Sequence, residues 1–259
     1  NLTSKIQAGR YEIPLTLTPI QVVELLQHGT FDVRLTFLEG WRREQYLEYA
    51  LSKLAVDNDV FSAEFLEETE SLEGYLFPDT YSVSIDTTAK NLVAKLRSNF
   101  DKRYNENIIA LEKKSGLSKS QIVIIASLLE RESVGDREEL GTIGGILIKR
   151  WKAGWYLGVD ATVQYALGRH WNAEKGWEWW KDDLTSQDLK IDSPYNTYKL
   201  TGLPPAPIAS PGLDALSAAA APLDSPYWFY LHAKIDGKIY IYYAKTLEEH
   251  NQNVAKYLK

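Results

Sequence analysis

The sequence predicts an α+β fold in two parts, a small αβ module over residues 1–68 and a larger mixed α/β domain over residues 69–259. Three observations support this prediction. Strand-like and helix-like segments alternate over roughly the first 55 residues, which is about the size of a small module. A long apolar run near the middle of the chain is typical of a buried central helix. Near the C-terminus, an Asp-Gly pair joins two segments of alternating polarity, which indicates a β-hairpin.

The amino-terminal module is predicted to contain two strand–helix pairs. In chain order they are a strand over Gln7–Ile13, a helix over Thr18–Gln27, a strand over Val33–Phe37 and a helix over residues 41–55. Thr18 suits the N-cap and Pro19 the first turn, and Gly29 follows the end of the first helix. The acidic stretch Asp57–Glu70 is expected to add a short helix and a connection.

The next segments lead towards the centre of the chain. Residues 71–83, SLEGYLFPDTYSV, are expected to form a loop because a glycine and a proline interrupt them. Glu73 and Asp79 are the ionisable residues of this loop, and Asp79 could simply cap a turn after the proline. Residues 88–114 are amphipathic and predict one helix that leads into the central one.

The central helix is predicted over Ser118–Ser133, SKSQIVIIASLLERES. Ser118 and Gln121 have the spacing of a reciprocal capping box. From Ile122 to Leu129 only Ser127 is polar, so the helix is expected to be covered on nearly every side. It is far too short to span a bilayer.

This helix ends in two glutamates that point in different directions. At about 100° per residue, Glu130 shares a face with small side chains, whereas Glu132 lies on the opposite face. The helix C-terminus and the apolar neighbours both disfavour a charged carboxylate, so we expect a raised pKa at Glu130. A raised pKa suits a general acid near neutral pH. The alternative is that both glutamates merely end the helix and pair with Arg131, Arg137 or Lys149.

Further ordered elements are predicted in the carboxy-terminal half. A helix is expected over Leu140–Lys152, and its glycine pair should allow close packing because the sequence GTIGG lacks the spacing of a phosphate-binding loop. Strands over Tyr227–Ile235 and Lys238–Ala244 form the predicted hairpin. Thr246 and Glu249 have the spacing that caps a final helix.

Two segments of unusual composition lie between these elements. Tryptophan clusters in residues 171–183, and Trp177, Trp179 and Trp180 are candidates for stacking on sugar rings, although tryptophan also fills cores and interfaces. Residues 193–212 are rich in proline and too long for a simple connection, which is typical of a functional loop.

Composition excludes several classes of function. Hydrophobic residues make up 44% and charged residues 25% of the chain, as in ordinary folded proteins. A net charge of -6 and a pI of about 5.4 argue against nucleic acid as the main partner, because phosphate binding needs a basic stripe. No cysteine is present and the 4 histidines lack metal-ligand spacing, so no metal is expected. No GxSxG motif marks a serine hydrolase.

Four blocks in a fixed order resemble one known family. The blocks are EGYLFPDTY, ASLLERES, DATVQYALG, and SPYNTY followed by GLPP and SPG. Together they resemble the YceG-like family of endolytic murein transglycosylases, from about Gln7 to the C-terminus. The resemblance implies an enzyme that cleaves the MurNAc-GlcNAc β-1,4 bond inside peptidoglycan glycan strands. It also implies that Glu130 is the single general acid/base and that the amino-terminal module is LysM-like.

The resemblance assigns other residues to the sugar cleft and implies a cellular setting. The cleft residues are Glu73, Asp79, Gln164, Tyr195, Asn196 and Tyr198. No metal and no cofactor are implied. The implied partners are peptidoglycan glycan strands and, among proteins, peptidoglycan synthases. The implied location is the cell membrane, with a single-pass N-terminal anchor outside this chain and the catalytic domain on the extracytoplasmic side.

The implied reaction needs one carboxyl group. This group protonates the glycosidic oxygen and then, as a carboxylate, assists attack of the muramic acid C6 hydroxyl on its own C1, which leaves a 1,6-anhydroMurNAc end. A common hydrolase needs a second carboxylate within about 5 to 10 Å, and Glu132 on the opposite helix face is poorly placed for that role. Two alternatives stay open. One is a water-using hydrolase with Glu73 or Asp79 nearby, and the other is a non-catalytic peptidoglycan-binding protein.

Overall fold

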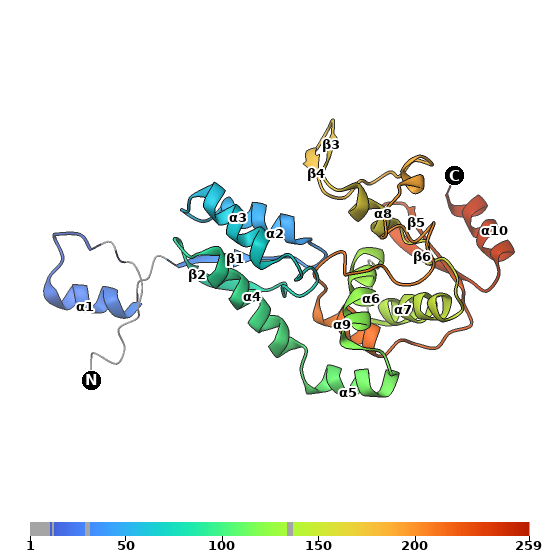
Figure 1. The fold of residues 1–259 in the computed structure, drawn as a ribbon, viewed down its shortest axis with the longest axis horizontal. Coiled ribbons are helices and arrows are strands. Elements are labelled where there is room, and N and C mark those ends of the chain that lie inside the picture. The colour runs from blue at the N-terminus through green and yellow to red at the C-terminus, as the bar shows by residue number, and fades with distance from the viewer. Residues whose placement is uncertain (1–10, 12, 29–31, 134–136, 259) are drawn as a thin grey trace.

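The computed structural model describes residues 11, 13–28, 32–133 and 137–258 (Figure 1). In chain order, its elements are α1 (Pro19–His28), β1 (Asp32–Thr36), α2 (Arg43–Leu51), α3 (Asn58–Glu68), β2 (Thr80–Ser84), α4 (Ala89–Arg103), α5 (Glu106–Ser115), α6 (Lys119–Glu132), α7 (Arg137–Lys152), α8 (Asp160–Leu167), β3 (His170–Asn172), β4 (Gly176–Glu178), the 3-10 helix η2 (Asp188–Lys190), α9 (Leu213–Ala220), β5 (Phe229–Ile235), β6 (Lys238–Ala244) and α10 (Leu247–Tyr257). Helix α1 lies at one end of the molecule and α10 at the other. The predicted α+β class is confirmed, whereas the LysM-like character of the amino-terminal module stays a prediction.

The first hydrophobic core lies between a two-stranded sheet and three helices. Strands β1 and β2 pair antiparallel, with Leu35 opposite Tyr81 and Val33 opposite Val83. Side chains of α2, α3 and α4 complete this core. The predicted strand over Val33–Phe37 and the two helices after it are therefore confirmed. The prediction of a loop over residues 71–83 is wrong at its end, because alternate burial of Tyr81 and Val83 makes that end a strand.

The predictions for the two ends of this part have different outcomes. Helix α1 confirms the predicted helix, and the Thr18 hydroxyl accepts a hydrogen bond from the Gln21 backbone N–H at 3.4 Å. The predicted strand over Gln7–Ile13 lies largely outside the described residues, as does Gly29. The division of the chain at residue 68 stays a prediction, and both β2 and α4 follow that residue while they pack in the first core.

The single helix predicted over residues 88–114 is instead two helices, α4 and α5. Tyr104 leaves the helical region with a ψ of 64°. Asn105 then caps the second helix, since its side chain accepts a hydrogen bond from the Asn107 backbone N–H at 3.0 Å. Asparagine competes with the helix in this way because its side chain bonds the local backbone.

Helix α6 forms the centre of the second core, as predicted. Ser118 and Gln121 make the expected capping box. Ile122 to Leu129 are all buried, and α6 packs against α7 and α9 (Figure 1). The buried Ser127 hydroxyl accepts a hydrogen bond from the Ile208 backbone N–H at 3.1 Å, which ties the proline-rich loop to this helix.

The glycine pair of α7 allows the close packing that the sequence predicted. A Cβ atom on Gly144 would lie 3.3 Å from Leu129 Cδ1. A Cβ atom on Gly145 would lie only 2.0 Å from the backbone oxygen of Leu223. The backbone after α9 therefore runs directly across α7 at Gly145.

The carboxy-terminal hairpin is also confirmed. Strands β5 and β6 pair antiparallel from Phe229 opposite Ala244 to Ile235 opposite Lys238. Asp236 and Gly237 both have positive φ, at 51° and 79°, as a two-residue type I′ turn requires. Thr246 is the N-cap of α10, and its side chain accepts a hydrogen bond from the Glu249 backbone N–H. Within the described residues, none of the helices has the length and hydrophobicity needed to cross a bilayer.

Candidate functional site

The two glutamates at the end of α6 lie in different surroundings. Glu130 accepts a hydrogen bond from the Gly212 backbone N–H at 2.9 Å. Burial raises its pKa to about 7, against the lowering effect of this hydrogen bond, and the nearby charge of Glu39 adds to the rise. The raised pKa predicted for Glu130 is thus confirmed, while its catalytic role stays a prediction.

Glu39 is a neighbour of Glu130 that no pattern in the sequence indicated. Its carboxylate packs so closely against Gly212 that a Cβ atom there would lie 1.7 Å from Glu39 Oε1. Burial, and next the charge of Asp214, raises the pKa of Glu39. Gly40 follows it at φ 74°, with Glu130 Cγ at 3.7 Å from the position of an added Cβ. Only the folding of the β1–α2 connection onto residues 210–212 brings these groups together.

Glu132 is half-buried on the other face of α6. The Tyr230 hydroxyl donates a hydrogen bond to Glu132 Oε2 at 2.6 Å. Burial raises the pKa of Glu132 to about 7, against this hydrogen bond, and the negative charge of Asp160 raises it further. The carboxyl group is therefore poised near neutral pH, as a proton-transfer group requires.

A polar cavity of about 500 Å³ lies in front of Glu132. Its wall comes from α6, α7, α8, the proline-rich loop, β5 and α10. The side chains that carry its chemistry are those of Glu132, Arg150, Asp160, Tyr198 and Tyr230. Because the cavity combines an acid, a cation and hydroxyl donors, it suits a polar substrate such as a sugar.

Fixed hydrogen bonds hold the cavity wall in place. Arg150 donates from Nε to the Trp228 carbonyl oxygen at 2.8 Å and from Nη1 to the Leu157 carbonyl oxygen at 2.6 Å. The Tyr198 hydroxyl donates to Asp160 Oδ1. Of these residues, only Tyr198 was predicted for the cleft. Arg150, Asp160 and Tyr230 were missed because their elements converge only in the folded chain.

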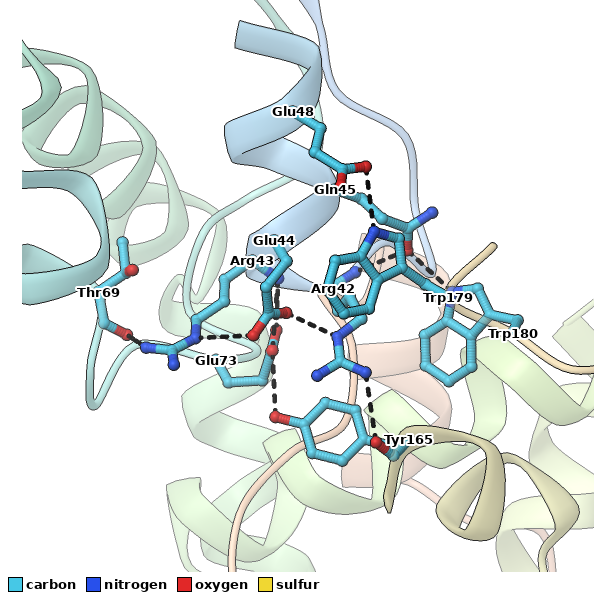
Figure 2. A network of polar contacts seen from close by, with 10 residues as sticks. All are labelled: Arg42, Arg43, Glu44, Gln45, Glu48, Thr69, Glu73, Tyr165, Trp179 and Trp180. Atoms are coloured by element: carbon cyan, nitrogen blue, oxygen red, sulfur yellow. Dashed lines mark hydrogen bonds and ion pairs between the residues drawn. The ribbon is translucent and has the colours of Figure 1, made fainter. Parts of the chain in front are cut away.

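Two other predicted cleft residues, Glu73 and Tyr195, line a second cavity of about 410 Å³. The buried Glu73 carboxylate accepts hydrogen bonds from the Arg43 backbone N–H at 3.2 Å and from the Tyr165 hydroxyl at 3.3 Å (Figure 2). Burial, and next the charge of Glu44, raises the pKa of Glu73 to about 8. The lining residues of this second cavity and of the Glu132 cavity are different.

The remaining predicted residues have structural partners. The Asn196 amide, fully buried, donates to the carbonyl oxygens of Leu189 at 3.0 Å and Ile191 at 2.9 Å. Gln164 donates to the Lys181 carbonyl oxygen at 2.7 Å. These contacts hold the proline-rich loop and the tryptophan-rich segment, and a role in sugar binding stays a prediction for both residues.

Asp79 lies at the start of β2 and binds side chains of α4. Its carboxylate accepts hydrogen bonds from Arg103 at 2.8 Å, Asn99 at 3.1 Å and the Thr80 backbone N–H at 2.8 Å. Burial alone would raise the pKa of Asp79, but these donors outweigh it, so the pKa is lowered. This geometry agrees with the turn-capping alternative, and the assignment of Asp79 to the sugar cleft stays a prediction.

The buried Glu73 predicts a pH dependence of stability. Its folded pKa of about 8 lies above the ordinary value of 4.5, so between those values the folded protein holds a proton that the unfolded chain has lost. The free energy of unfolding must then fall as the pH rises through this window. We expect Glu73→Gln to flatten this slope in urea unfolding at pH 5 to 8, leaving the parts due to Glu130 and Glu132. A variant with the full wild-type slope would contradict the assignment.

Within residues 11, 13–28, 32–133 and 137–258, no group of three or more His, Asp or Glu side chains is placed to hold a metal ion. Metal independence stays a prediction. The polar side chains that line the Glu132 cavity include carboxyl, hydroxyl and guanidinium groups and the imidazoles of His232 and His250.

Comparison with known proteins places the chain in a family. The model of the YceG-like family matches residues 1–256. The chain is 36% identical over 203 residues to the endolytic murein transglycosylase of Bacillus subtilis, covering 78% of this chain and 52% of that protein. It is 31% identical over 241 residues to the endolytic murein transglycosylase of Streptococcus pneumoniae, a match that covers 92% of this chain and 42% of that protein. The chain thus spans about half, or less, of the length of these curated relatives.

A solved structure supports the same relationship. The crystal structure of a putative yceG-like protein from Listeria monocytogenes has a TM-score of 0.72 and 28% sequence identity to the chain. The match covers 96% of this chain and 85% of the other. Because the family model matches nearly every residue and the fold agrees, this chain belongs to the YceG-like family.

Proposed function

We propose that this chain carries the catalytic region of an endolytic murein transglycosylase, which cleaves the MurNAc-GlcNAc β-1,4 bond within peptidoglycan glycan strands. Membership of the YceG-like family and the names of the two curated relatives support the reaction class. The observation that carries the site assignment is the half-buried carboxyl group of Glu132 in the wall of a polar cavity. Turnover of purified glycan strands tests the proposal, and binding without cleavage would leave a peptidoglycan-binding protein.

The geometry favours Glu132 over Glu130 as the proton-transfer group. Both carboxyl groups have a pKa near 7. Glu132 faces the cavity together with Tyr198, whereas Glu130 accepts a hydrogen bond from backbone and packs near Glu39. Substrate must reach the acid within hydrogen-bond distance, so an acid in a cavity wall is better placed. Glu130 remains the candidate that the sequence and the family resemblance favour.

In the proposed reaction, protonated Glu132 gives its proton to the glycosidic oxygen as the bond breaks. The resulting carboxylate then takes the proton of the muramic acid C6 hydroxyl, whose oxygen bonds to C1 of the same ring. Tyr230 holds the carboxyl group by its 2.6 Å hydrogen bond. Asp160 lines the same cavity, where its negative charge would stabilise the positive charge that develops at the sugar ring.

Asp160 also gives the hydrolase alternative a specific form. A retaining or inverting hydrolase uses two carboxyl groups, and Glu132 and Asp160 line one cavity. The second carboxylate was expected at Glu73 or Asp79, and neither of them lines this cavity. The chemical form of the product end separates the two reactions, because the hydrolase leaves a reducing sugar.

The proposal predicts a pH profile for cleavage. Glu132 must be protonated to act as an acid, and its pKa is raised to about 7. The value of kcat/KM should therefore fall as the pH rises above about 7, with a slope near one proton. A rate that stays constant from pH 6 to pH 9 would contradict a role for a carboxyl group of this pKa.

The cellular setting belongs to the same proposal. The names of the two relatives give murein, which is peptidoglycan, as their substrate. An N-terminal membrane anchor, a position on the extracytoplasmic side and contact with peptidoglycan synthases follow from the family resemblance. Localisation of the full-length protein with an accessible tag would test this part.

A further inference from the structure

The hairpin of β3 and β4 presents two exposed tryptophans. Trp171 and Trp177 are directly opposite each other in the pairing and are 63% and 58% exposed. Their ring centroids are 5.5 Å apart and the rings are inclined at 75°. The hairpin extends away from the body of the molecule (Figure 1). Two large indoles thus form an open corner at the end of an arm.

The base of this arm is fixed to α2. Trp179 Nε1 donates to Glu48 Oε2 at 3.1 Å, and Trp180 Nε1 donates to Gln45 Oε1 at 2.8 Å (Figure 2). Glu48 also forms an ion pair with Arg169 at 3.4 Å. Trp179 and Trp180, which were candidates for sugar stacking, therefore serve as anchors. The exposed tip is held by these anchors, which is the condition for a preorganised binding surface.

The anchor leads directly to the cavity that holds Glu73. The Arg42 guanidinium lies over the Trp179 ring at 4.6 Å and over the Tyr165 ring at 4.2 Å (Figure 2). Tyr165 lines the Glu73 cavity and donates to the Glu73 carboxylate. The arm is thus continuous with a polar cavity, through a stack of one guanidinium and two aromatic rings.

The charges of the arm favour contact with an uncharged surface of the ligand. Its lysines form ion pairs with carboxylates, Lys175 with Asp182 at 2.5 Å and Lys181 with Asp188 at 2.6 Å. Arg169 lies over the Trp177 ring at 5.2 Å while it pairs with Glu48. An anionic membrane or nucleic acid would need unpaired basic residues. A sugar ring instead presents an apolar C–H face that packs on an indole, with its hydroxyls left in water.

We propose that Trp171 and Trp177 form a remote glycan-strand subsite, which stacks an N-acetylated sugar ring outside the polar cavity that holds Glu73. This inference rests on the proposed function, because it takes the glycan strand as the substrate. The subsite holds a strand that is longer than the cavity and so favours long substrates over short ones.

Equilibrium binding to purified glycan strands, freed of stem peptides, tests the subsite. All proteins carry Glu130→Gln and Glu132→Gln so that the strands stay intact. Trp171→Ala/Trp177→Ala should raise the Kd by about tenfold or more, since two aromatic contacts are lost. Trp171→Phe/Trp177→Phe keeps flat rings and should retain most of the affinity. Tyr240→Ala removes another exposed aromatic residue, 45% exposed on β6, and should leave the Kd unchanged.

Three results would overturn the subsite. The first is an unchanged Kd for the alanine pair, and the second is an equal loss of affinity in Tyr240→Ala. The third is a loss of binding to vesicles of anionic phospholipid, measured in parallel, with no loss of binding to glycan strands. Thermal unfolding of each variant checks that the protein is still folded. The parent chain is assayed for cleavage separately, so failure of the transglycosylase proposal with intact strand binding remains distinguishable from failure of the subsite.

Discussion

Glu132→Gln is expected to lower cleavage of purified glycan strands by about 10² to 10⁴, the effect assigned to general acid–base catalysis. Glutamine keeps the size of the side chain and can still accept the Tyr230 hydrogen bond, which is 2.6 Å long in the wild type. It cannot supply the proton that the leaving oxygen needs. The loss should therefore appear in kcat, with little change in thermal stability.

Glu130→Gln is the matched control because the two glutamates lie on either side of Arg131 at the end of the same helix. Its carboxylate accepts the Gly212 N–H, and a glutamine oxygen can do the same. We expect a much smaller loss of cleavage for this variant. The opposite pattern, an inactive Glu130→Gln and an active Glu132→Gln, would restore the assignment made from the sequence.

Gly145→Ala should cause a large loss of stability for so small a change of side chain. The added Cβ would lie 2.0 Å from the Leu223 backbone oxygen, and a backbone atom cannot give way as a flexible side chain can. Overpacking of this kind costs about 3 kcal/mol or more. Denaturant unfolding should show this loss, or the protein should fail to accumulate in folded form.

Gly144→Ala is the control for this substitution. Its Cβ would lie 3.3 Å from Leu129 Cδ1, which is the end of a movable side chain. Alanine also gains up to about 1 kcal/mol over glycine in a helix interior. A small net change at residue 144 and a large loss at residue 145 are expected. Equal effects at both positions would show that the backbone after α9 does not cross α7 at Gly145.

Local signals in the sequence predicted most of the helices and one hairpin correctly. The capping box at Ser118, the N-cap at Thr246 and the Asp236-Gly237 turn each depend on residues within a few positions of one another. Strand β2 was missed because its partner is distant in the chain, as in the pair of Thr36 with Thr80. The break between α4 and α5 had a local signal in Asn105, which the amphipathic pattern on both sides concealed.

The candidate site was predicted only in part for the same reason. Helical periodicity correctly separated the directions of Glu130 and Glu132, and burial raises the pKa of both. It could not show which face opens to a cavity, since Tyr230 and Tyr198 come from segments far along the chain. The tryptophans were similarly ambiguous, because only the fold shows that Trp179 binds α2 while Trp171 stays exposed.

Mass spectrometry of the ends of digested glycan strands tests the central claim most directly. The purified chain is incubated with strands in the presence of a chelator, and the fragments are separated and weighed. The proposed reaction predicts 1,6-anhydroMurNAc ends, lighter by one water than reducing ends, because the C6 hydroxyl of the ring replaces water as the nucleophile. Reducing MurNAc ends would show that water is the nucleophile and would contradict the transglycosylase reaction, and intact strands would contradict catalysis by this chain.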